Sequence, residues 1–437
     1  MIKLSDTPKE WELEDFVAAH FACRGAYVET GVTERNPTDV SDLDVVWTDY
    51  RSEKPVAYPV EVKSGECHLR DVFKFYGWTQ YLGLQAGQFV HSEPIGSADE
   101  DSLKKISEKT GIGFLRVEKQ EDAEKHLETL GLPKTPWADL PDLWRFSFWA
   151  QRRLIASLNQ AIKQGICPET AKAAKEYYRL INDAVFFMPD VASRVEKLLD
   201  AHFGHQQLAR SAALETEKKE VEFAVPANTD TFQDALFKGR HYPVQACMYL
   251  AHRARLYVLK AAVDYSIGVA AGAIKTMKIK IGDVSLDLGT AGLHAAFMKG
   301  VQQLGKAKSF RLFPAFWQSF LYTWGGFFLL DRLDQEYERI SKETGVPVEE
   351  IPVALKAFDL LFPVDGGWMR KCSTAKHWLV MLTPAALRGI GSARRLDMYG
   401  CKGYSDLKYT DYTGADLSRD NNATYRILSC KTDELTK

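Results

Sequence analysis

The sequence lacks several motifs that would assign a chemistry directly. Its 437 residues contain no GxxxxGK[ST] phosphate loop and no GxSxG motif, so neither a P-loop ATPase nor a GxSxG serine hydrolase is indicated. The seven cysteines form no CxxC pair, and this odd, scattered set favours free thiols in a reducing compartment. The N-terminal segment is charged and has no apolar signal-peptide core, so we expect a cytoplasmic protein.

Long apolar runs are scarce as well. Residues 312–330 (LFPAFWQSFLYTWGGFFLL) approach the length of a bilayer span. The run contains Pro314, Gln318 and Thr323, and polar residues are costly inside a membrane. We therefore expect a buried core helix here and no membrane association.

Charge of one sign is not in excess either. The 56 Lys and Arg residues nearly balance 58 Asp and Glu residues, which leaves a net charge of −2. Any nucleic-acid surface must therefore be a local patch. A hydrophobic content of 46% is ordinary for a globular protein, and the length allows two or three domains.

The pattern of elements divides the chain into three parts. Residues 1–118 predict the order α, β, β, β, α, β, α, β, which is an α/β arrangement. Residues 119–141 are charged and then rich in proline, and we interpret them as a linker. Residues 142–437 are expected to be mainly α-helical, with a hairpin predicted at 277–289.

Two neighbouring strands of the first part carry charged residues in their interior. In AYPVEVKSGE, Glu61 and Lys63 share one face of the strand, because side chains alternate along it. The preceding run SDLDVVW places Asp42 and Asp44 together on one face. If the polar faces coincide, two carboxylates and an ammonium converge. Metal-assisted phosphodiester cleavage uses such a set, in which carboxylates hold Mg²⁺ and the lysine orients the attacking water.

The run SDLDVVWTDYRSEKPVAYPVEVKSGE resembles the PD-(D/E)xK nuclease superfamily, which includes many restriction enzymes and archaeal Holliday-junction resolvases. Its signature is an acid on one strand followed by E-x-K on the next. Asp44 precedes Glu61 by 17 residues, and Lys63 completes the triplet. D-L-D-V stands where the signature has its proline, so Asp42 remains an alternative to Asp44. The resemblance covers roughly residues 1–118 and implies a restriction-endonuclease-like core.

Resolvase-like members also carry a glutamate in the first helix, about eleven residues before a glycine that ends it. Glu14 precedes Gly25 by eleven residues and fits this position better than Glu12 or Asp15. The resemblance implies that Glu14 supports the metal centre.

A polar residue on the helix after the E-x-K strand completes the family pattern. Gln80 is the first candidate for it and Lys74 the second. The implied catalytic residues are Glu14, Asp44, Glu61, Lys63 and Gln80. The implied ligands of Mg²⁺ or Mn²⁺ are Glu14, Asp44 and Glu61.

These residues favour a hydrolase that cleaves nucleic acid, with DNA as the first expectation. An RNase with the same site stays open, because such a site reads phosphates and not sugars. A surface ion-pair cluster, or a catalytically silent nuclease fold that serves as a scaffold, also stays open. A nuclease domain joined to a long helical region resembles the arrangement of a defence or restriction-type effector.

Basic clusters in residues 142–437 would suit phosphate contacts, although a solvated helix face explains each equally well. The arginines concerned are Arg152, Arg153, Arg253, Arg255, Arg394 and Arg395. We expect the helical region to select the substrate, to bind a protein partner or second copy, or to regulate activity. His202 and His205 have helical spacing but no third ligand nearby in the sequence, so we expect no metal site there.

Overall fold

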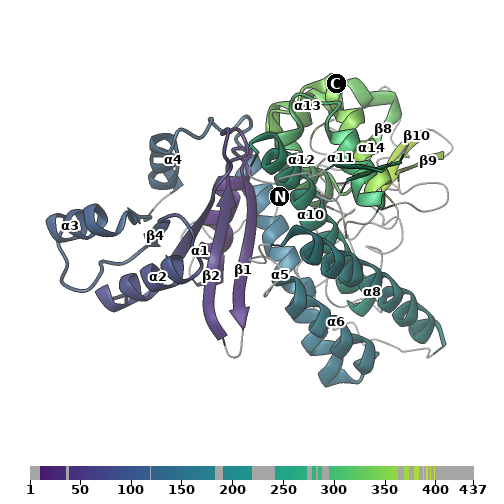
Figure 1. Cartoon of the computed structure of the whole chain (residues 1–437). Helices are drawn as coiled ribbons and strands as arrows, with labels where there is room; N and C mark the ends of the chain where they lie inside the picture. Colours follow the sequence, from purple (N-terminus) through teal and green to yellow (C-terminus); the bar gives the residue numbers. More distant parts are fainter. Residues whose placement is uncertain are drawn as a thin grey trace. The chain divides into compact units, whose positions relative to one another are not determined.

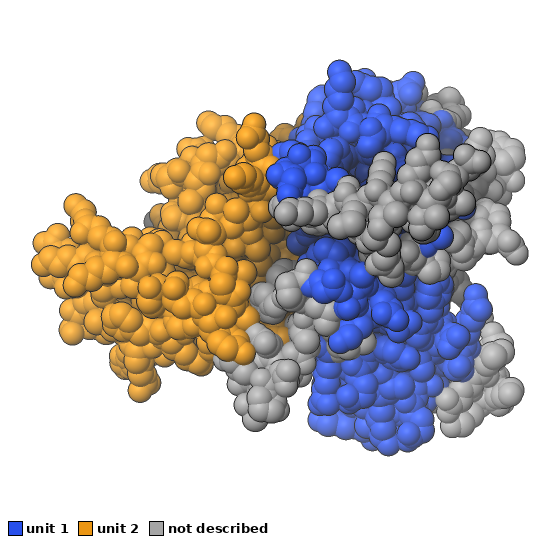
Figure 2. Space-filling model, viewed as in Figure 1, with its two compact units in different colours: residues 1, 150–181, 188–437 blue, residues 2–149, 182–187 orange. Residues whose placement is uncertain are grey.

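The structure is a computed structural model, and it describes most of the chain between residues 10 and 398. The described residues are 10–35, 39–118, 120–182, 190–218, 242–272, 278–281, 284–287, 295–362, 369–373, 378–382, 387, 390, 391, 394 and 398. They belong to two compact units (Figure 2). The N-terminal unit comprises residues 2–149 and 182–187, and the helical unit comprises residues 1, 150–181 and 188–437.

The N-terminal unit has the order of elements that the sequence predicts (Figure 1). The first helix ends close to Gly25, whose φ of 81° is a conformation that glycine adopts without strain. The elements are α1 (Trp11–Ala22), β1 (Tyr27–Arg35), β2 (Asp39–Thr48), β3 (Ala57–Lys63), α2 (Leu69–Tyr81), β4 (Gln88–His91), α3 (Glu100–Thr110) and β5 (Gly113–Arg116). An α/β N-terminal part is therefore confirmed.

The five strands form one mixed sheet in the order β1-β2-β3-β4-β5. Strands β1, β2 and β3 are antiparallel neighbours, whereas β3, β4 and β5 run parallel. Parallel neighbours need a crossover connection, and α2 and α3 supply the two crossovers. The carboxyl ends of β3, β4 and β5 therefore meet at one edge of the sheet.

Aromatic packing distinguishes the two faces of this sheet. On one face, Trp47 stacks between Phe21 of α1 and Tyr58 of β3, with ring centroids 4.8 and 4.7 Å away. On the other face, Phe75 of α2 packs edge-on against Phe89 of β4 at 6.4 Å. Phe89 is the register partner of Glu61, so Glu61 lies on the α2 face. The predicted charged pair thus lies beside α2 and opposite the face that α1 covers.

The N-terminal unit continues past the boundary expected at residue 118. Helix α4 (Gln120–Thr129) falls in the predicted linker and contacts α1 and β5. Its Ala123 and Leu127 are buried. This segment is an amphipathic helix despite its many charged residues. Its two apolar side chains lie one turn apart and attach it to the unit.

The helical unit is built mainly from long helices, as the sequence predicts. Helix α8 packs along α10, and α11 packs against α14. Its larger helices are α5 (Leu140–Gln164, which begins in the N-terminal unit), α6 (Pro168–Asn182), α8 (Val191–Lys218), α10 (Tyr242–Ala270), α11 (Ala295–Leu304), α12 (Phe313–Tyr322), α13 (Leu333–Thr344) and α14 (Ile351–Leu361). Its short helices are η2 (Phe310–Leu312), η3 (Leu330–Arg332) and η4 (Val348–Glu350).

Strands in this unit are short. The hairpin predicted at 277–289 is confirmed as the antiparallel pair β6 (Lys278–Ile281) and β7 (Val284–Asp287). A second sheet has the order β8-β10-β9 and is antiparallel throughout. Its strands are β8 (Phe327–Leu329), β9 (Met369–Ser373) and β10 (Trp378–Leu382).

The apolar run at 312–330 contains the buried helix that its sequence predicts. Every residue of α12 is buried. Within the described ranges, no helix combines the length and apolar character needed to cross a bilayer. The run therefore serves as core of the helical unit.

Candidate active site

Strands β2 and β3 bring the predicted carboxylates together. Their register pairs Val45 with Val60. One step further along both strands places Asp44 opposite Glu61, and directly opposed residues of an antiparallel pair point to the same face. The backbone N–H of Val62 donates to Oδ2 of Asp44 at 2.8 Å. Asp44 is thus fixed against the strand that carries Glu61.

Glu61 and Lys63 form an ion pair through Oε1 of the glutamate. The Glu61 side chain is only 5% exposed, whereas that of Lys63 is 35% exposed. No donor among the described residues reaches the buried Oε2 of Glu61. The pair therefore presents a solvent-accessible ammonium beside a buried carboxylate oxygen that can still accept a ligand.

The environment of Asp44 disfavours its charge. Burial, followed by the negative charges of Glu61 and Glu14, raises its pKa to about 8. The Val62 N–H and the Lys63 ammonium oppose this rise. The charges of two further carboxylates thus act on Asp44, and a site crowded with negative charge attracts a cation.

Lys63 is held in its charged form. Burial by itself would lower its pKa, but the charges of Glu61, Asp44 and Asp71 outweigh burial and raise the pKa. A lysine in this state is an ammonium at neutral pH, so it can donate hydrogen bonds and cannot take a proton.

The pKa of Glu61 is raised by burial, against the opposing positive charges of Lys63 and Lys74. Lys74 lies on α2, with Nζ 4.5 Å from the ring centre of Trp78. It is the α2 residue whose charge acts on Glu61. Gln80, the first candidate on this helix, is exposed, and no contact in the described part of the chain joins it to the carboxylates. A role for Gln80 stays a prediction.

Asp42 and Glu14 take different places around the site. Asp42 is exposed, and its Oδ1 accepts a hydrogen bond from Oγ1 of Thr33 at 3.3 Å. Glu14 is half-buried on α1, and its charge acts on Asp44. Of the two aspartates on β2, it is Asp44 that contacts β3.

Two carboxylates of this site are suited to bind a divalent cation. No group of three or more His, Cys, Asp or Glu side chains in the described ranges is arranged to hold a metal ion. Mg²⁺, however, is commonly bound through one or two carboxylates, with the remaining ligands supplied by water and substrate phosphate. Asp44 and the unpartnered Oε2 of Glu61 provide hard oxygen donors of that kind. Glu14 as a further ligand stays a prediction.

Three of the arginines predicted to contact phosphates lie instead in the interior of the helical unit. Arg253 and Arg255 on α10 are buried, and so is Arg394. The Arg255 guanidinium lies over the ring of Phe358 at 5.3 Å. Guanidinium groups are weakly hydrated and stack on aromatic faces, which explains their burial. The prediction of surface contacts is therefore wrong for these three arginines.

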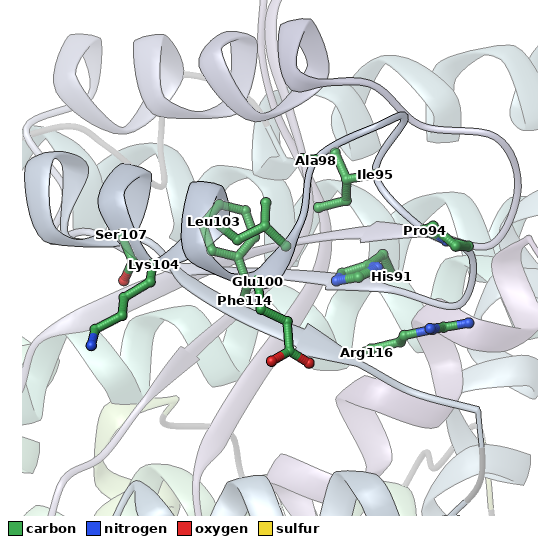
Figure 3. Close-up of a pocket in the computed structure, with 10 residues that line it drawn as sticks. All are labelled: His91, Pro94, Ile95, Ala98, Glu100, Leu103, Lys104, Ser107, Phe114 and Arg116. Carbon is green, nitrogen blue, oxygen red and sulfur yellow. The ribbon is translucent and has the colours of Figure 1, made fainter.

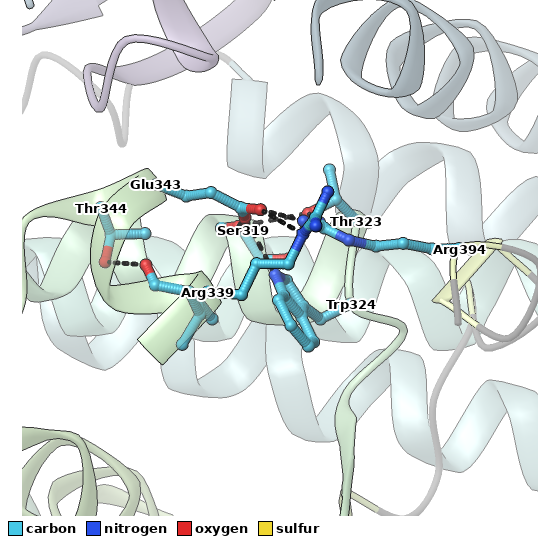
Figure 4. A network of polar contacts seen from close by, with 8 residues as sticks. Ser319, Thr323, Trp324, Arg339, Glu343, Thr344 and Arg394 are labelled. Carbon is cyan, nitrogen blue, oxygen red and sulfur yellow. Dashed lines mark hydrogen bonds and ion pairs between the residues drawn. The ribbon is translucent and has the colours of Figure 1, made fainter. Parts of the chain in front are cut away.

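Arg394 belongs to a buried polar network (Figure 4). Its Nη1 donates to Oγ1 of Thr323 at 3.0 Å, and its Nη2 pairs with Oε1 of Glu343. Nε1 of Trp324 donates to Oε2 of the same glutamate at 3.0 Å. Both terminal nitrogens of this guanidinium thus have acceptors within the protein, which indicates a structural role.

The structure describes some of the remaining candidates in the helical unit and not others. Arg152 is half-buried on α5. Arg395 and the side chain of Arg153 lie outside the described residues. His202 and His205 are fully buried, and Nε of Arg255 lies 3.3 Å from Nδ1 of His202.

Comparison of the chain with family models, with curated proteins and with solved structures found no match.

Proposed function

We propose that this chain is a metal-dependent nuclease that hydrolyses phosphodiester bonds, with DNA as its expected substrate. One observation carries the proposal. Asp44 and Glu61 lie on one face of adjacent strands, beside an ion-paired Lys63 and with Oε2 of Glu61 available. Structural ion pairs at a surface do not need a buried carboxylate oxygen without a donor.

Each residue of the candidate site would have a separate role in such a reaction. Asp44 and Glu61 would hold a divalent cation, and Glu14 adds negative charge behind Asp44. A bound Mg²⁺ would neutralise the scissile phosphate and acidify a water molecule. Lys63, which is partly exposed and charged, would orient the attacking water and stabilise the charge that develops on the phosphate oxygens.

The raised pKa of Lys63 limits its part in the chemistry. A general base needs a free electron pair near the working pH, and this ammonium has none. A group other than Lys63 must therefore accept the proton of the attacking water, and Lys63 would act as an electrostatic and positioning group.

The test compares the full chain with its Lys63→Ala variant on plasmid, single-stranded DNA and RNA, each with Mg²⁺, Mn²⁺ or EDTA. Lys54→Ala is the matched control, because it removes an exposed lysine from the turn between β2 and β3. We expect metal-dependent cleavage by the wild type and by Lys54→Ala. Loss of one preorganised charge-stabilising group lowers rates by about 100- to 1,000-fold, and we expect that loss in Lys63→Ala.

The substrate arms also decide between the alternatives. Cleavage of RNA alone would make the chain an RNase with the same site. If Lys63→Ala cleaves as fast as the wild type, the cleavage does not take place at this site. Absence of cleavage in every arm would contradict a nuclease that is active by itself and favour a scaffold.

A further inference from the structure

A cavity of about 460 Å³ opens at the carboxyl ends of β4 and β5 (Figure 3). Its size lies within the range of small-molecule sites, about 300–1,000 Å³. Its lining comes from the strand ends, from the loop between β4 and α3, and from α3 itself. In open α/β sheets, ligands bind in crevices outside the carboxyl ends of the parallel strands.

The register of the sheet connects this cavity to the candidate active site. Lys63 pairs with His91 across β3 and β4, and His91 pairs with Arg116 across β4 and β5. Paired residues of parallel strands point to the same face. Because neighbouring strands lie about 4.8 Å apart, His91 and Arg116 continue the row that begins at Lys63. A ligand in the cavity therefore lies one or two strands away from the predicted scissile phosphate.

The lining combines an apolar floor with cationic groups. Phe114 and Leu103 supply aromatic and aliphatic surface. Lys104 and Arg116 supply positive charge, and Arg116 also pairs with Glu118 at 2.8 Å. Glu100 adds an acceptor on the first turn of α3. A ring to stack on, cations for a phosphate and acceptors for base N–H groups are the features that a nucleotide requires.

The tautomer of His91 also suits a nucleotide ligand in the cavity. Its Nδ1 lies 2.8 Å from the carbonyl oxygen of Glu93, which can only accept, so Nδ1 carries the proton. Burial lowers the pKa of His91, and the positive charge of Arg116 acts in the same direction. The hydrogen bond to Glu93 opposes this shift. The neutral ring then leaves Nε2 as an acceptor at the cavity, suited to an exocyclic amino group of a base.

We propose that this cavity binds a nucleotide of the substrate strand that neighbours the scissile phosphate, with its base against Phe114 and its phosphate toward Lys104 and Arg116. The proposal rests on the proposed nuclease function. A free nucleotide has the same chemistry as a nucleotide within a strand, and the two sources are separated by the test.

The experiment measures binding without cleavage. The full chain, wild type and Asp44→Asn, is titrated in EDTA with nucleoside 5′-monophosphates and with a short fluorescein-labelled single-stranded DNA. The same strand with abasic sites is titrated in parallel. Phe114→Ala removes the stacking surface, and Lys104→Ala removes an exposed charge on α3 at no risk to the fold. Lys105→Ala is the matched control, since it is the neighbouring exposed lysine outside the cavity.

We expect Phe114→Ala to weaken binding of mononucleotide and DNA by about tenfold, the scale of one base–aromatic stack, and Lys104→Ala to weaken both through loss of a phosphate contact. Lys105→Ala should bind as the wild type does, and abasic sites should weaken strand binding. Equal binding by the two cavity variants and the wild type would overturn the proposal. Mononucleotide binding that depends on Phe114, combined with strand binding that does not, would overturn it in favour of a free nucleotide ligand.

These outcomes are separable from those of the nuclease assay. If no substrate is cut but nucleotide binding depends on Phe114 and Lys104, the proposed function fails while the nucleotide cavity stands. If Lys63 is required for cleavage but the cavity variants bind normally, the nuclease stands and the cavity proposal fails.

Discussion

At the scale of single residues, the charge of Asp44 depends on its neighbours. In the folded chain its pKa is raised to about 8 by burial and by Glu61 and Glu14, against an ordinary value of 3.8. Between these two values the folded state holds a proton that the unfolded state has lost. Stability therefore falls as the pH rises through this window, because the folded state binds more protons there.

Asp44→Asn should remove this pH dependence. Asparagine keeps the shape and can still accept the Val62 N–H, but it cannot ionise. Relative to the wild type, we expect Asp44→Asn to gain unfolding free energy by up to about 1.4 kcal/mol per pH unit across the window. Urea unfolding monitored from about pH 5 to about pH 9 measures this difference.

Asp42→Asn is the control for removal of an exposed carboxylate from the same strand, and it should keep the pH dependence that Asp44 causes. Addition of Mg²⁺ should stabilise the wild type more at the alkaline end, because a ligand must be deprotonated to bind, and should stabilise Asp44→Asn less. Parallel pH profiles of the wild type and Asp44→Asn would contradict the raised pKa.

Residue placement was predictable where strand alternation applied. The facing of Glu61 and Lys63 follows from a period of two, and the structure confirms that they pair. Alternation does not apply to helices, where spacing leaves the rotation about the axis open. For that reason Lys74, not Gln80, acts on Glu61, and Arg255 faces aromatic rings instead of solvent.

At the scale of elements, the order of the N-terminal helices and strands was predictable, but the interior of the apolar run at 312–330 was not. Its first half forms α12, whereas Phe327–Leu329 forms β8. A continuous apolar run has no period that separates helix from strand. The signal for the change is Gly325-Gly326, where both residues adopt positive φ. The partner of β8 is β10, about fifty residues further along the chain, and no local pattern indicates that pairing.

The packing of α11 on α14 depends on a glycine. A Cβ at Gly300 would lie 2.3 Å from Cγ of Leu361, which is closer than real contacts allow. Gly300→Ala should therefore destabilise the chain by about 1–3 kcal/mol through overpacking, although alanine is the better helix former. Thermal unfolding measures the change.

Gly305→Ala is the matched control just beyond the end of α11. Its Cβ would meet only the Gln302 carbonyl oxygen at 3.5 Å, an ordinary contact. We expect this variant to remain within about 0.5 kcal/mol of the wild type. A Gly300→Ala variant as stable as Gly305→Ala would show that α11 and α14 separate at little cost.

At the scale of the whole molecule, a buried ion pair in the helical unit connects segments that are far apart in the sequence. Arg394 reaches Thr323 over 71 positions and Glu343 over 51 positions. Its guanidinium also lies 4.3 Å from the ring centre of Trp324. Neither the burial nor the partner of this arginine follows from the sequence, because the contact forms only once residues 323–343 have folded.

Breaking this pair on one side should be costlier than replacing both sides. Arg394→Ala or Glu343→Ala leaves a buried charge without its partner, and such changes cost about 3–5 kcal/mol. Arg394→Met combined with Glu343→Leu removes both charges and should cost less than either single change, because apolar groups of similar size need no desolvation. Chemical unfolding of the three variants measures this order.

Arg339→Ala controls for loss of a charge near the same carboxylate, since Nε of Arg339 lies 3.9 Å from Oε1 of Glu343 and its side chain is 24% exposed. A partly exposed ion pair contributes about 0–1 kcal/mol, so this variant should lie close to the wild type. If Arg394→Ala were equally mild, water would have to solvate Glu343 in its place. The network would then be a loose surface contact, and the attachment of residue 394 to α12 and α13 would rest on apolar packing alone.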